Sequence, residues 1–398
     1  KLMSDLVLNH VSSQGHWFNA YRQGQDPYDT FFFEADPSDD LSMVVRPRTT
    51  PLLRRVDTAN GVRHVWCTFS HDQIDLDFRN PQVLLEFLRI IRLHVDNGVE
   101  IIRLDAVAFL WKEIGSETNV PKAENLSYFG QGNEAHAIYN FPLPPLILHA
   151  MMSGSAQHLR RWQRGMPPAP MGCAYLNFTA SHDGIGMRPA EGLLPEHEKQ
   201  QMIDTVRAAG GLVSMRTMPD GSQSPYELNT TFYAALERTF KGADQYHRER
   251  FICSQTIVMS LEGIPAFYIH SLLATPNDHE AVEHRGMNRA INRHRWDYPA
   301  LRALLDDPAS PQSQVLGALT DRLKLRGRQT AFHPNATQFT VNMGDDRIFG
   351  VWRQSLDRHQ SIFALHNISD ETVTISSEAL NLIEDVAWHD LLSGEAVD

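Results

Sequence analysis

The sequence predicts an α/β protein whose strands run parallel, followed by a small antiparallel β region. Short apolar runs alternate with stretches of helical period over residues 1–330, the pattern of βα units and a parallel sheet. From about residue 331, apolar runs follow one another without helices between them, which indicates antiparallel strands. At 398 residues, the chain is long enough for two or three domains.

The chain opens with a strand and a long insertion. Leu2–Leu8 is a strand-like apolar run that ends in Asn9 and His10. Residues 11–78 contain many aromatic residues, prolines and aspartates but show little helical period. We therefore expect an inserted, loop-rich subdomain there, after which the α/β pattern resumes at residue 79.

A helix and a strand follow the insertion. Residues 81–97 carry apolar side chains at helical spacing, with Pro81 in the first turn and Gly98 just past the end. Proline is favoured at the start of a helix and glycine just after its end, so this segment predicts a helix. The apolar run Val99–Leu104 predicts a buried strand.

The remaining elements follow the same two patterns. We expect strands at residues 137–141, 174–178 and 264–269. Helical period is clear over residues 251–261 and over most of residues 300–325. The late apolar runs lie at residues 337–341, 348–352, 361–368 and 372–375, separated only by turns. They predict a C-terminal antiparallel β-domain over residues 331–398.

Composition and charge restrict the class of protein. The 36 basic and 48 acidic residues give a formal net charge of −12, which disfavours nonspecific binding to nucleic acid or to an anionic membrane. No apolar run approaches the length of a membrane span. The three cysteines lie far apart in apolar surroundings and lack the paired spacing of zinc ligands. We expect free thiols, a cytoplasmic location and no bound metal.

Three acidic residues stand in short motifs that suit sugar chemistry. Asp105 ends the run Ile101–Asp105, Glu117 begins Glu117–Val120, and Asp183 lies in Phe178–Gly184. Retaining glycosyl transfer needs a nucleophilic carboxylate and a protonated carboxyl group, and a third acidic group can assist them.

These motifs, preceded by Asp5–His10, resemble in their order the signature regions of the α-amylase superfamily (glycoside hydrolase family 13). Their flanking residues are most similar to its sucrose-phosphorylase-type branch, and the resemblance covers essentially the whole chain. It implies a (β/α)8 TIM barrel, which carries its chemistry on loops at the C-terminal ends of the strands. The catalytic barrel would comprise residues 1–10 and 79–330, with residues 11–78 inserted after the third strand.

The barrel that the resemblance implies is incomplete in this sequence. Leu2–Leu8 resembles the family's third strand, so we expect strands 1 and 2 to be missing from this chain. Only 11 residues separate Asp105 from Glu117. A return helix alone needs about 11 residues to span a five-residue strand, which leaves none for loops or for the fifth strand. We therefore expect a shortened or partial version of a longer protein.

The resemblance implies a role for each motif residue. Asp105 would be the nucleophile, Glu117 the general acid and base, and Asp183 the residue that stabilises the transition state. The residues expected to bind the glucosyl unit are His10, His182 and Arg293.

Two further side chains are expected to support the nucleophile and its loop. Arg103 lies two residues before Asp105 on the same strand and so points to the same side. Its guanidinium can hold Asp105 ionised and correctly aimed. Asp5 and Asn9 are expected to brace the adjoining loop rather than to touch the substrate.

A phosphorylase uses inorganic phosphate, where a hydrolase uses water, to release the sugar from the enzyme. Phosphate selection needs positive charge or oriented donors. The segment Gly211–Asn229 is a plausible acceptor loop, and Arg216, Gln223 and His270 are the candidate phosphate or acceptor ligands. The resemblance implies phosphate as a co-substrate, no cofactor, a small-molecule glucoside as partner, and a homodimer as one possible assembly.

Within the branch, the flanks of Asp105 and Asp183 are most similar to those of glucosylglycerate and sucrose-6-phosphate phosphorylases. We therefore rank a glucosylglycerate first as substrate, ahead of sucrose 6-phosphate and sucrose. Two alternatives stay open: a glucoside hydrolase or transglucosylase of the same superfamily, and a truncated remnant without activity.

Overall fold

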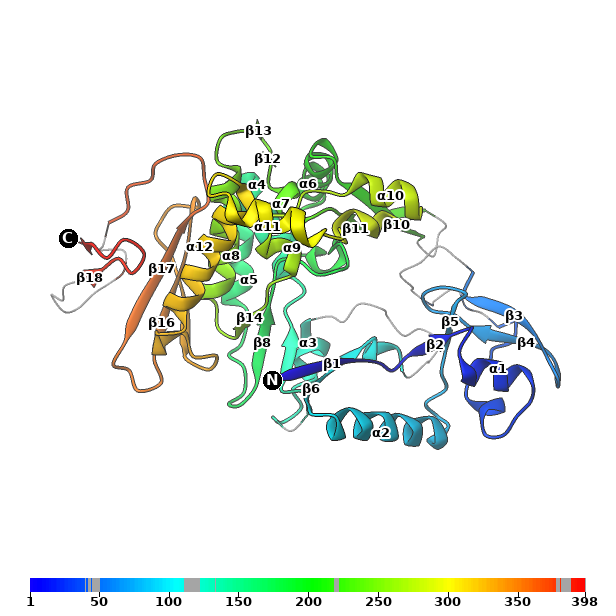
Figure 1. Cartoon of the computed structure of the whole chain (residues 1–398). Coiled ribbons are helices and arrows are strands. Elements are labelled where there is room, and N and C mark those ends of the chain that lie inside the picture. Colours follow the sequence, from blue (N-terminus) through cyan, green and yellow to red (C-terminus); the bar gives the residue numbers. More distant parts are fainter. Residues whose placement is uncertain are drawn as a thin grey trace. The chain divides into compact units, whose positions relative to one another are not determined.

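The structure is a computed structural model in which the described residues are 1–39, 41, 44, 51–110, 122–132, 134–217, 222–376, 380 and 388–397 (Figure 1). The chain divides into two compact units. Unit 1 comprises Lys1–Val120 and Met215–Ser224, and unit 2 comprises Pro121–Ser214 and Pro225–Asp398. Within the described segments, no helix is both long and apolar enough to cross a bilayer.

In unit 1, β1 (Leu2–Val7) and β6 (Val99–Asp105) form a two-stranded parallel sheet. Both strands lie where the sequence predicts them. The prediction that the second strand is buried is wrong, because Ile101 is 40% exposed and Leu104 is 47% exposed. Among the described residues this sheet has only two strands, so few neighbours are available to cover the side chains of β6.

Helix α2 (Pro81–Asp96) leads into β6 and confirms the helix predicted at residues 81–97. The side chain of Asn80 accepts a hydrogen bond from the backbone N–H of Gln82, which satisfies one of the free donors at the helix start. Gly98 follows the helix with a φ of 84°, a left-handed conformation that favours glycine. The chain turns there from the helix into β6.

The insertion in unit 1 is more regular than the sequence predicts. It contains β2 (His10–Ser12), α1 (His16–Arg22), the 3-10 turn η1 (Tyr28–Thr30), β3 (Leu53–Thr58), β4 (Gly61–Trp66) and β5 (Gln73–Asp75). β3 and β4 pair as an antiparallel hairpin, and β2 pairs with β5. Phe18 and Phe31 are almost fully buried in its core. The prediction of a loop-rich segment is wrong for these stretches, because strand pairing and contacts among aromatic side chains, neither of which has a helical period, organise them.

Unit 2 contains a parallel sheet of β7 (Ala137–Tyr139), β8 (Ala174–Asn177) and β14 (Ile264–Pro265), in the order β14–β8–β7. The first two strands confirm the prediction. The third is shorter than predicted, because α9 (Ile269–Leu272) begins within that apolar run. Gly263, with a φ of 109°, precedes β14, and a Cβ there would lie 2.3 Å from the carbonyl oxygen of Tyr175. Glycine therefore lets β14 approach β8.

A second sheet has the order β10–β11–β9, formed by β9 (Ile185–Gly186), β10 (Leu212–Thr217) and β11 (Gln223–Asn229). The smaller helical elements are η2 (Val107–Phe109), α3 (Lys122–Ser127), η3 (Arg188–Ala190), α7 (Phe232–Ala235), α10 (His279–Arg285), η4 (Asn288–Asn292) and η5 (Thr330–Phe332).

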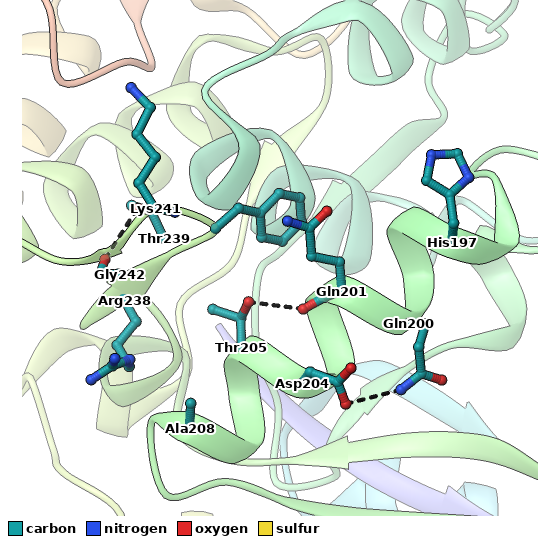
Figure 2. Close-up of a pocket in the computed structure, with 11 residues that line it drawn as sticks. His197, Gln200, Gln201, Asp204, Thr205, Ala208, Arg238, Thr239, Lys241 and Gly242 are labelled. Atoms are coloured by element: carbon teal, nitrogen blue, oxygen red, sulfur yellow. Dashed lines mark hydrogen bonds between the residues drawn. The ribbon is translucent and has the colours of Figure 1, made fainter.

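A shallow pocket of about 490 Å³ lies between α6 (Glu196–Ala208) and the turn that joins β12 (Arg238–Thr239) to β13 (Gly242–Ala243) (Figure 2). Most of its lining residues carry polar side chains, and some of these already hydrogen-bond to neighbours, as Gln200 does to Asp204. None of the predicted site residues lines this pocket. The size of this pocket is therefore no reason to place the active site there.

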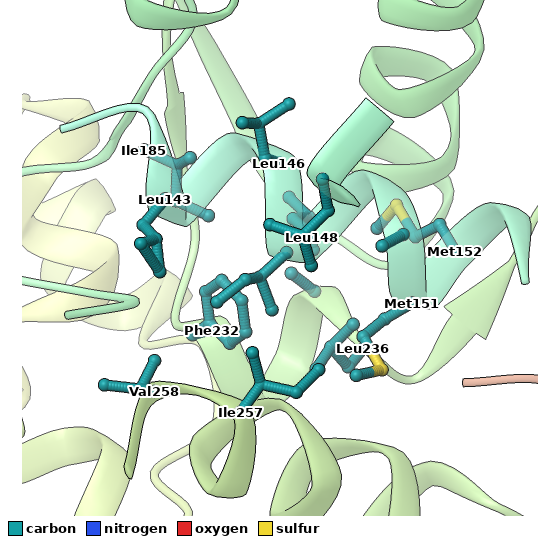
Figure 3. Packing of buried hydrophobic residues seen from close by; sticks show 14 of the residues in the cluster. Leu143, Leu146, Leu148, Met151, Met152, Ile185, Phe232, Leu236, Ile257 and Val258 are labelled. Atoms are coloured by element: carbon teal, nitrogen blue, oxygen red, sulfur yellow. The ribbon is translucent and has the colours of Figure 1, made fainter. Parts of the chain in front are cut away.

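The main hydrophobic core of unit 2 surrounds α4 (Leu143–Ser153), which is buried on all sides (Figure 3). The helices α5 (Gln157–Arg164) and α8 (His247–Ser260) contribute to the same core. Figure 3 shows Phe232, Leu236 and Ile257 facing the side chains of α4. Each fully buried leucine or phenylalanine contributes about 1.5–3 kcal/mol of transfer free energy. The prediction of a helix at residues 251–261 is confirmed by α8.

At the C-terminal end, α11 (Tyr298–Asp306) and α12 (Pro311–Arg326) confirm the predicted helical stretch. β15 (Thr337–Val341), β16 (Ile348–Gln354) and β17 (Ser361–Asn367) form an antiparallel sheet at three of the four predicted positions. The fourth prediction, residues 372–375, is wrong, because the described backbone there is irregular and forms no strand. A separate pair, β18 (Trp388–His389) and β19 (Ala396–Val397), follows.

Buried His366 should make the stability of unit 2 depend on pH. It lies on β17, its Nε2 is 2.9 Å from Ser260 Oγ, and burial lowers its pKa to about 4. Since the unfolded imidazole titrates near 6.5, the folded state is stabilised above that pH, and this stabilisation is lost as the pH falls towards 4. We expect a loss of about 2–3 kcal/mol between pH 7 and 4.5 in urea unfolding.

The control for this prediction is His366→Gln, which keeps a polar partner for Ser260 but does not titrate. It should lose less stability than the wild type over the same pH interval. Equal losses in the two proteins would show that His366 is not the responsible group.

Candidate active site

The predicted site residues divide between the two units. Asp5, His10, Arg103 and Asp105 belong to unit 1, and His182, Asp183, His270 and Arg293 belong to unit 2. Glu117 lies outside the described residues.

In unit 1, Asp105 is the last residue of β6 and forms an ion pair with Arg103. The guanidinium of Arg103 donates to Asp105 Oδ1 at 2.9 Å, and it also donates to both oxygens of Asp5 at 2.7 Å. The structure thus brings Arg103 and Asp105 together as predicted. Ala106 follows with a φ of 54°, a left-handed conformation that costs a residue other than glycine about 1 kcal/mol. The strained turn ends β6 immediately after the carboxylate.

His10 lies at the start of β2, next to fully buried Asn9. Its Nδ1 is 3.3 Å from Asn9 Nδ2, and its Nε2 is 2.8 Å from Gln73 Nε2 on β5. Both ring nitrogens therefore have an amide neighbour, and Phe69 contacts the ring. Gln73 is a further candidate site residue, which the sequence did not indicate. No local motif marks it, because the contact depends on the pairing of β2 with β5 across more than 60 residues.

In unit 2, His182 and Asp183 lie in the loop between β8 and β9. Asn292 donates to the carbonyl oxygens of Ser181 and Asp183, at 3.2 and 2.7 Å. Arg293 donates from Nε to the carbonyl of His182 at 2.7 Å and from its terminal nitrogen to Asp183 Oδ1 at 3.4 Å. The structure therefore brings together three predicted residues. It also shows that η4 and the residue after it anchor the loop.

The strongest ion pair of Asp183 is with Arg289, which the sequence analysis did not select. Arg289 donates to Asp183 Oδ1 and, through Nε and a terminal nitrogen, to the two oxygens of Glu227 on β11. Burial alone would lower the pKa of Arg289, but the hydrogen bonds and charge of Glu227 raise it above its ordinary value. The spacing of Arg289 and Arg293, four residues apart, was a visible signal that both could face one loop. Nothing in the local sequence marked Glu227.

The predicted acceptor segment Gly211–Asn229 is largely regular structure. β10 and β11 occupy most of it, and residues 218–221 between them lie outside the described residues. Arg216 is buried in β10, whereas Gln223 is exposed at the start of β11. The prediction of a loop is wrong for the two strands, because both join β9 in a three-stranded sheet.

The side chain of His270, another candidate phosphate ligand, is buried. It is 6% exposed in α9, and its Nδ1 lies 3.1 Å from Thr275 Oγ1. Burial and nearby His294 lower its pKa, with a small opposing effect of Asp278. A buried imidazole with a lowered pKa is neutral at pH 7, which removes the positive charge expected of a phosphate ligand. The structure therefore gives no support to His270 as a phosphate ligand.

Comparison with known proteins gives one family model, two similar relatives and one similar solved structure. A family model described as the α-amylase catalytic domain matches residues 1–153. The glucosylglycerate phosphorylase of Spirochaeta thermophila is 40% identical over 93% of this chain and 68% of its own length. That of Allomeiothermus silvanus is 39% identical over 96% of this chain and 74% of its own length. The match to the crystal structure of sucrose 6F-phosphate phosphorylase from Thermoanaerobacter thermosaccharolyticum covers 91% of the present chain and 81% of the phosphorylase chain. Its TM-score is 0.71 at 21% identity, a likeness in fold alone.

Proposed function

Because this chain belongs to the α-amylase family, glycoside hydrolase family 13, and to the part of it that contains glucosylglycerate phosphorylases, we propose that it is a retaining glucoside phosphorylase. The family membership inferred from the carboxylate motifs is thereby confirmed, and the fold is of the α-amylase (β/α)8 barrel type. The observation that carries the proposal is the 39–40% identity with glucosylglycerate phosphorylases over more than nine-tenths of the chain.

The reaction proceeds in two displacements. In the first, an oxygen of Asp105 attacks the anomeric carbon of the α-glucoside, the glycosidic bond breaks, and a covalent β-glucosyl ester forms. In the second, an oxygen of inorganic phosphate attacks the same carbon, and the ester bond to Asp105 breaks. The product is α-glucose 1-phosphate, with the configuration of the substrate retained. The ion pair between Arg103 and Asp105 supports this assignment, because it directs the carboxylate from the end of β6.

Two further groups complete the proposed chemistry. Glu117 gives its proton to the departing oxygen in the first displacement and takes a proton from the phosphate in the second. Asp183 accepts hydrogen bonds from the sugar hydroxyls while positive charge develops on the ring. Its two arginine neighbours support a fixed orientation for that carboxylate.

We propose glycerate as the leaving group. The relatives named for glucosylglycerate are more similar to this chain than those named for sucrose or for sucrose 6-phosphate, which are 24–27% identical. Glycerate is an anion, so its site needs positive charge or oriented donors. Arg216 on β10 and Gln223 at the start of β11 stay candidates for that role.

The test of this function is synthesis in the reverse direction. The protein is given α-glucose 1-phosphate with D-glycerate, fructose, fructose 6-phosphate or glycerol, and phosphate release is measured. We expect release that depends on D-glycerate and exceeds release with the other acceptors at least tenfold. Equal release with and without an acceptor would indicate hydrolysis, and release specific for fructose 6-phosphate would change the proposed substrate.

The finer organisation of the chain is also a proposal. We propose that the described residues hold no counterpart of the first two barrel strands or of most of the fifth, and that residues 331–398 form a C-terminal antiparallel β-domain. The two-stranded sheet of β1 and β6 and the antiparallel sheet β15–β17 support these assignments. A cytoplasmic location is supported by three cysteines that form no disulfide.

A further inference from the structure

Arg289 connects a carboxylate of the candidate active site to a carboxylate buried behind it. Its guanidinium donates two hydrogen bonds to Glu227, one to each carboxylate oxygen, and a third to Asp183 Oδ1. The Glu227 side chain is 5% exposed, whereas that of Asp183 is 39% exposed. Arg289 thus spans from the interior of unit 2 to the surface on which the sugar is proposed to bind.

Glu227 is itself held firmly. Asn229 donates from Nδ2 to Glu227 Oε1 at 2.6 Å, and Ser214 donates to Asn229 Oδ1 at 2.6 Å. The backbone of Glu227 lies opposite Gly186 where β11 pairs with β9. A guanidinium that binds a carboxylate through two parallel hydrogen bonds has a defined orientation, which a single bond does not impose. The orientation of Arg289 is therefore set by β11.

The loop that carries Asp183 fits closely against the same strand. A Cβ on Gly184 would lie 2.4 Å from the carbonyl oxygen of Leu228 and 2.6 Å from Glu227 Cγ. Asn292 also donates a hydrogen bond to the backbone carbonyl of Asp183 at 2.7 Å. The hydrogen bonds to the Asp183 carboxylate fall on Oδ1, and among the described residues Oδ2 has no hydrogen-bond donor. Oδ2 is thus the oxygen available to a sugar hydroxyl.

We propose that Glu227 and Arg289 are a positioning pair for the glycosyl transfer: Glu227 orients Arg289, and Arg289 holds Asp183 Oδ1 so that Oδ2 faces the glucosyl hydroxyls. This inference rests on the proposed function, because the role of Asp183 comes from it. Neither residue of the pair touches the reacting atoms. The pair acts by orienting Asp183, which stabilises the transition state. Changing either residue should therefore lower kcat more than it changes KM.

Two variants test the pair. Arg289→Lys keeps the charge but replaces the planar fork with a single ammonium group, which cannot reproduce three hydrogen bonds in fixed directions. Glu227→Gln keeps the size and one acceptor oxygen but removes the charge. For each, we expect kcat in reverse synthesis to fall about 10–100-fold, the usual range for supporting residues, with KM for α-glucose 1-phosphate changed less than about threefold. The matched control is Arg302→Lys in the exposed pair of Arg302 and Asp306 on α11, which should keep the wild-type kcat.

A double-mutant cycle separates positioning from a general structural role. If Glu227 acts through Asp183, Glu227→Gln should have little further effect in an Asp183→Asn background. Fully multiplicative losses in kcat, or wild-type kcat in both single variants, would overturn the proposal. Thermal unfolding of each variant identifies any loss that is due to misfolding.

Failure of the proposed function would have a different signature. In that case the wild type itself would release no phosphate with any acceptor. The pair would then be tested by calorimetric binding of 1-deoxynojirimycin, a cationic mimic of the glucose ring. Weaker binding by Asp183→Asn and Glu227→Gln than by the wild type and Arg302→Lys would support the pair. Equal binding by all four proteins, or none by the wild type, would overturn it.

Discussion

Asp105→Asn should abolish phosphorolysis, with kcat lowered on the order of 10⁴-fold or more. An amide cannot form the glucosyl ester, so the first displacement has no nucleophile. The fold should survive, because Arg103 keeps its two hydrogen bonds to Asp5 and the lost ion pair is partly exposed, worth less than about 1 kcal/mol. The measurement is phosphate release from α-glucose 1-phosphate, with thermal unfolding alongside.

The matched control is Asp57→Asn on β3. There, Arg55 and Asp57 form an exposed ion pair with the same spacing of two residues along a strand. This variant should keep wild-type activity, which would show that the loss in Asp105→Asn is not a general effect of removing a carboxylate from such a pair. Near-wild-type turnover by Asp105→Asn would refute the nucleophile assignment.

Asp183→Asn should lower kcat about 10²–10³-fold, the range typical of removing one group that stabilises transition-state charge. The amide keeps the shape of the side chain but places no negative charge near the developing oxocarbenium ion. Arg289 keeps Glu227 as a partner, so the variant leaves no buried cation unpaired and should fold. Steady-state kinetics should show the loss in kcat rather than in KM.

Asp346→Asn is a suitable control for this variant, because Asp346 pairs with the largely buried Arg160 in the same unit but lies outside the candidate site. Its kcat should match that of the wild type. A loss in Asp183→Asn that appears only as a raised KM would mean that Asp183 binds substrate and transition state equally well.

Local pattern predicted most regular elements. α2 follows from apolar residues at helical spacing between Pro81 and Gly98, and α8 from a similar run. The failures occurred where periodicity carries little information. In the aromatic insertion, rings on α1 pack against Phe31 and Phe32, and β3 pairs with β4 through the backbone. The predicted acceptor loop forms two strands of a sheet.

The candidate site likewise contains residues that local motifs predict and residues that only distant contacts bring in. Asp105, Asp183 and their flanking residues lie within short motifs, so the order of residues along the chain was enough to select them and to indicate the family and its chemistry. Gln73, Glu227 and Arg289 could not be selected in this way. Arg289 meets Asp183 across 106 residues and Glu227 across 62, and Gln73 meets His10 across 63.

The physical reason is that a motif specifies which chemical groups are present, whereas their orientation depends on contacts between strands and loops far apart in the chain. The resemblance of these motifs to a known family was sufficient to predict the family and the nucleophile, and the two-residue spacing of Arg103 and Asp105 predicted their pairing on one strand. The buried carboxylate that orients Arg289 behind Asp183 was decided only by the pairing of β9 with β11 and by the packing of η4 against the loop.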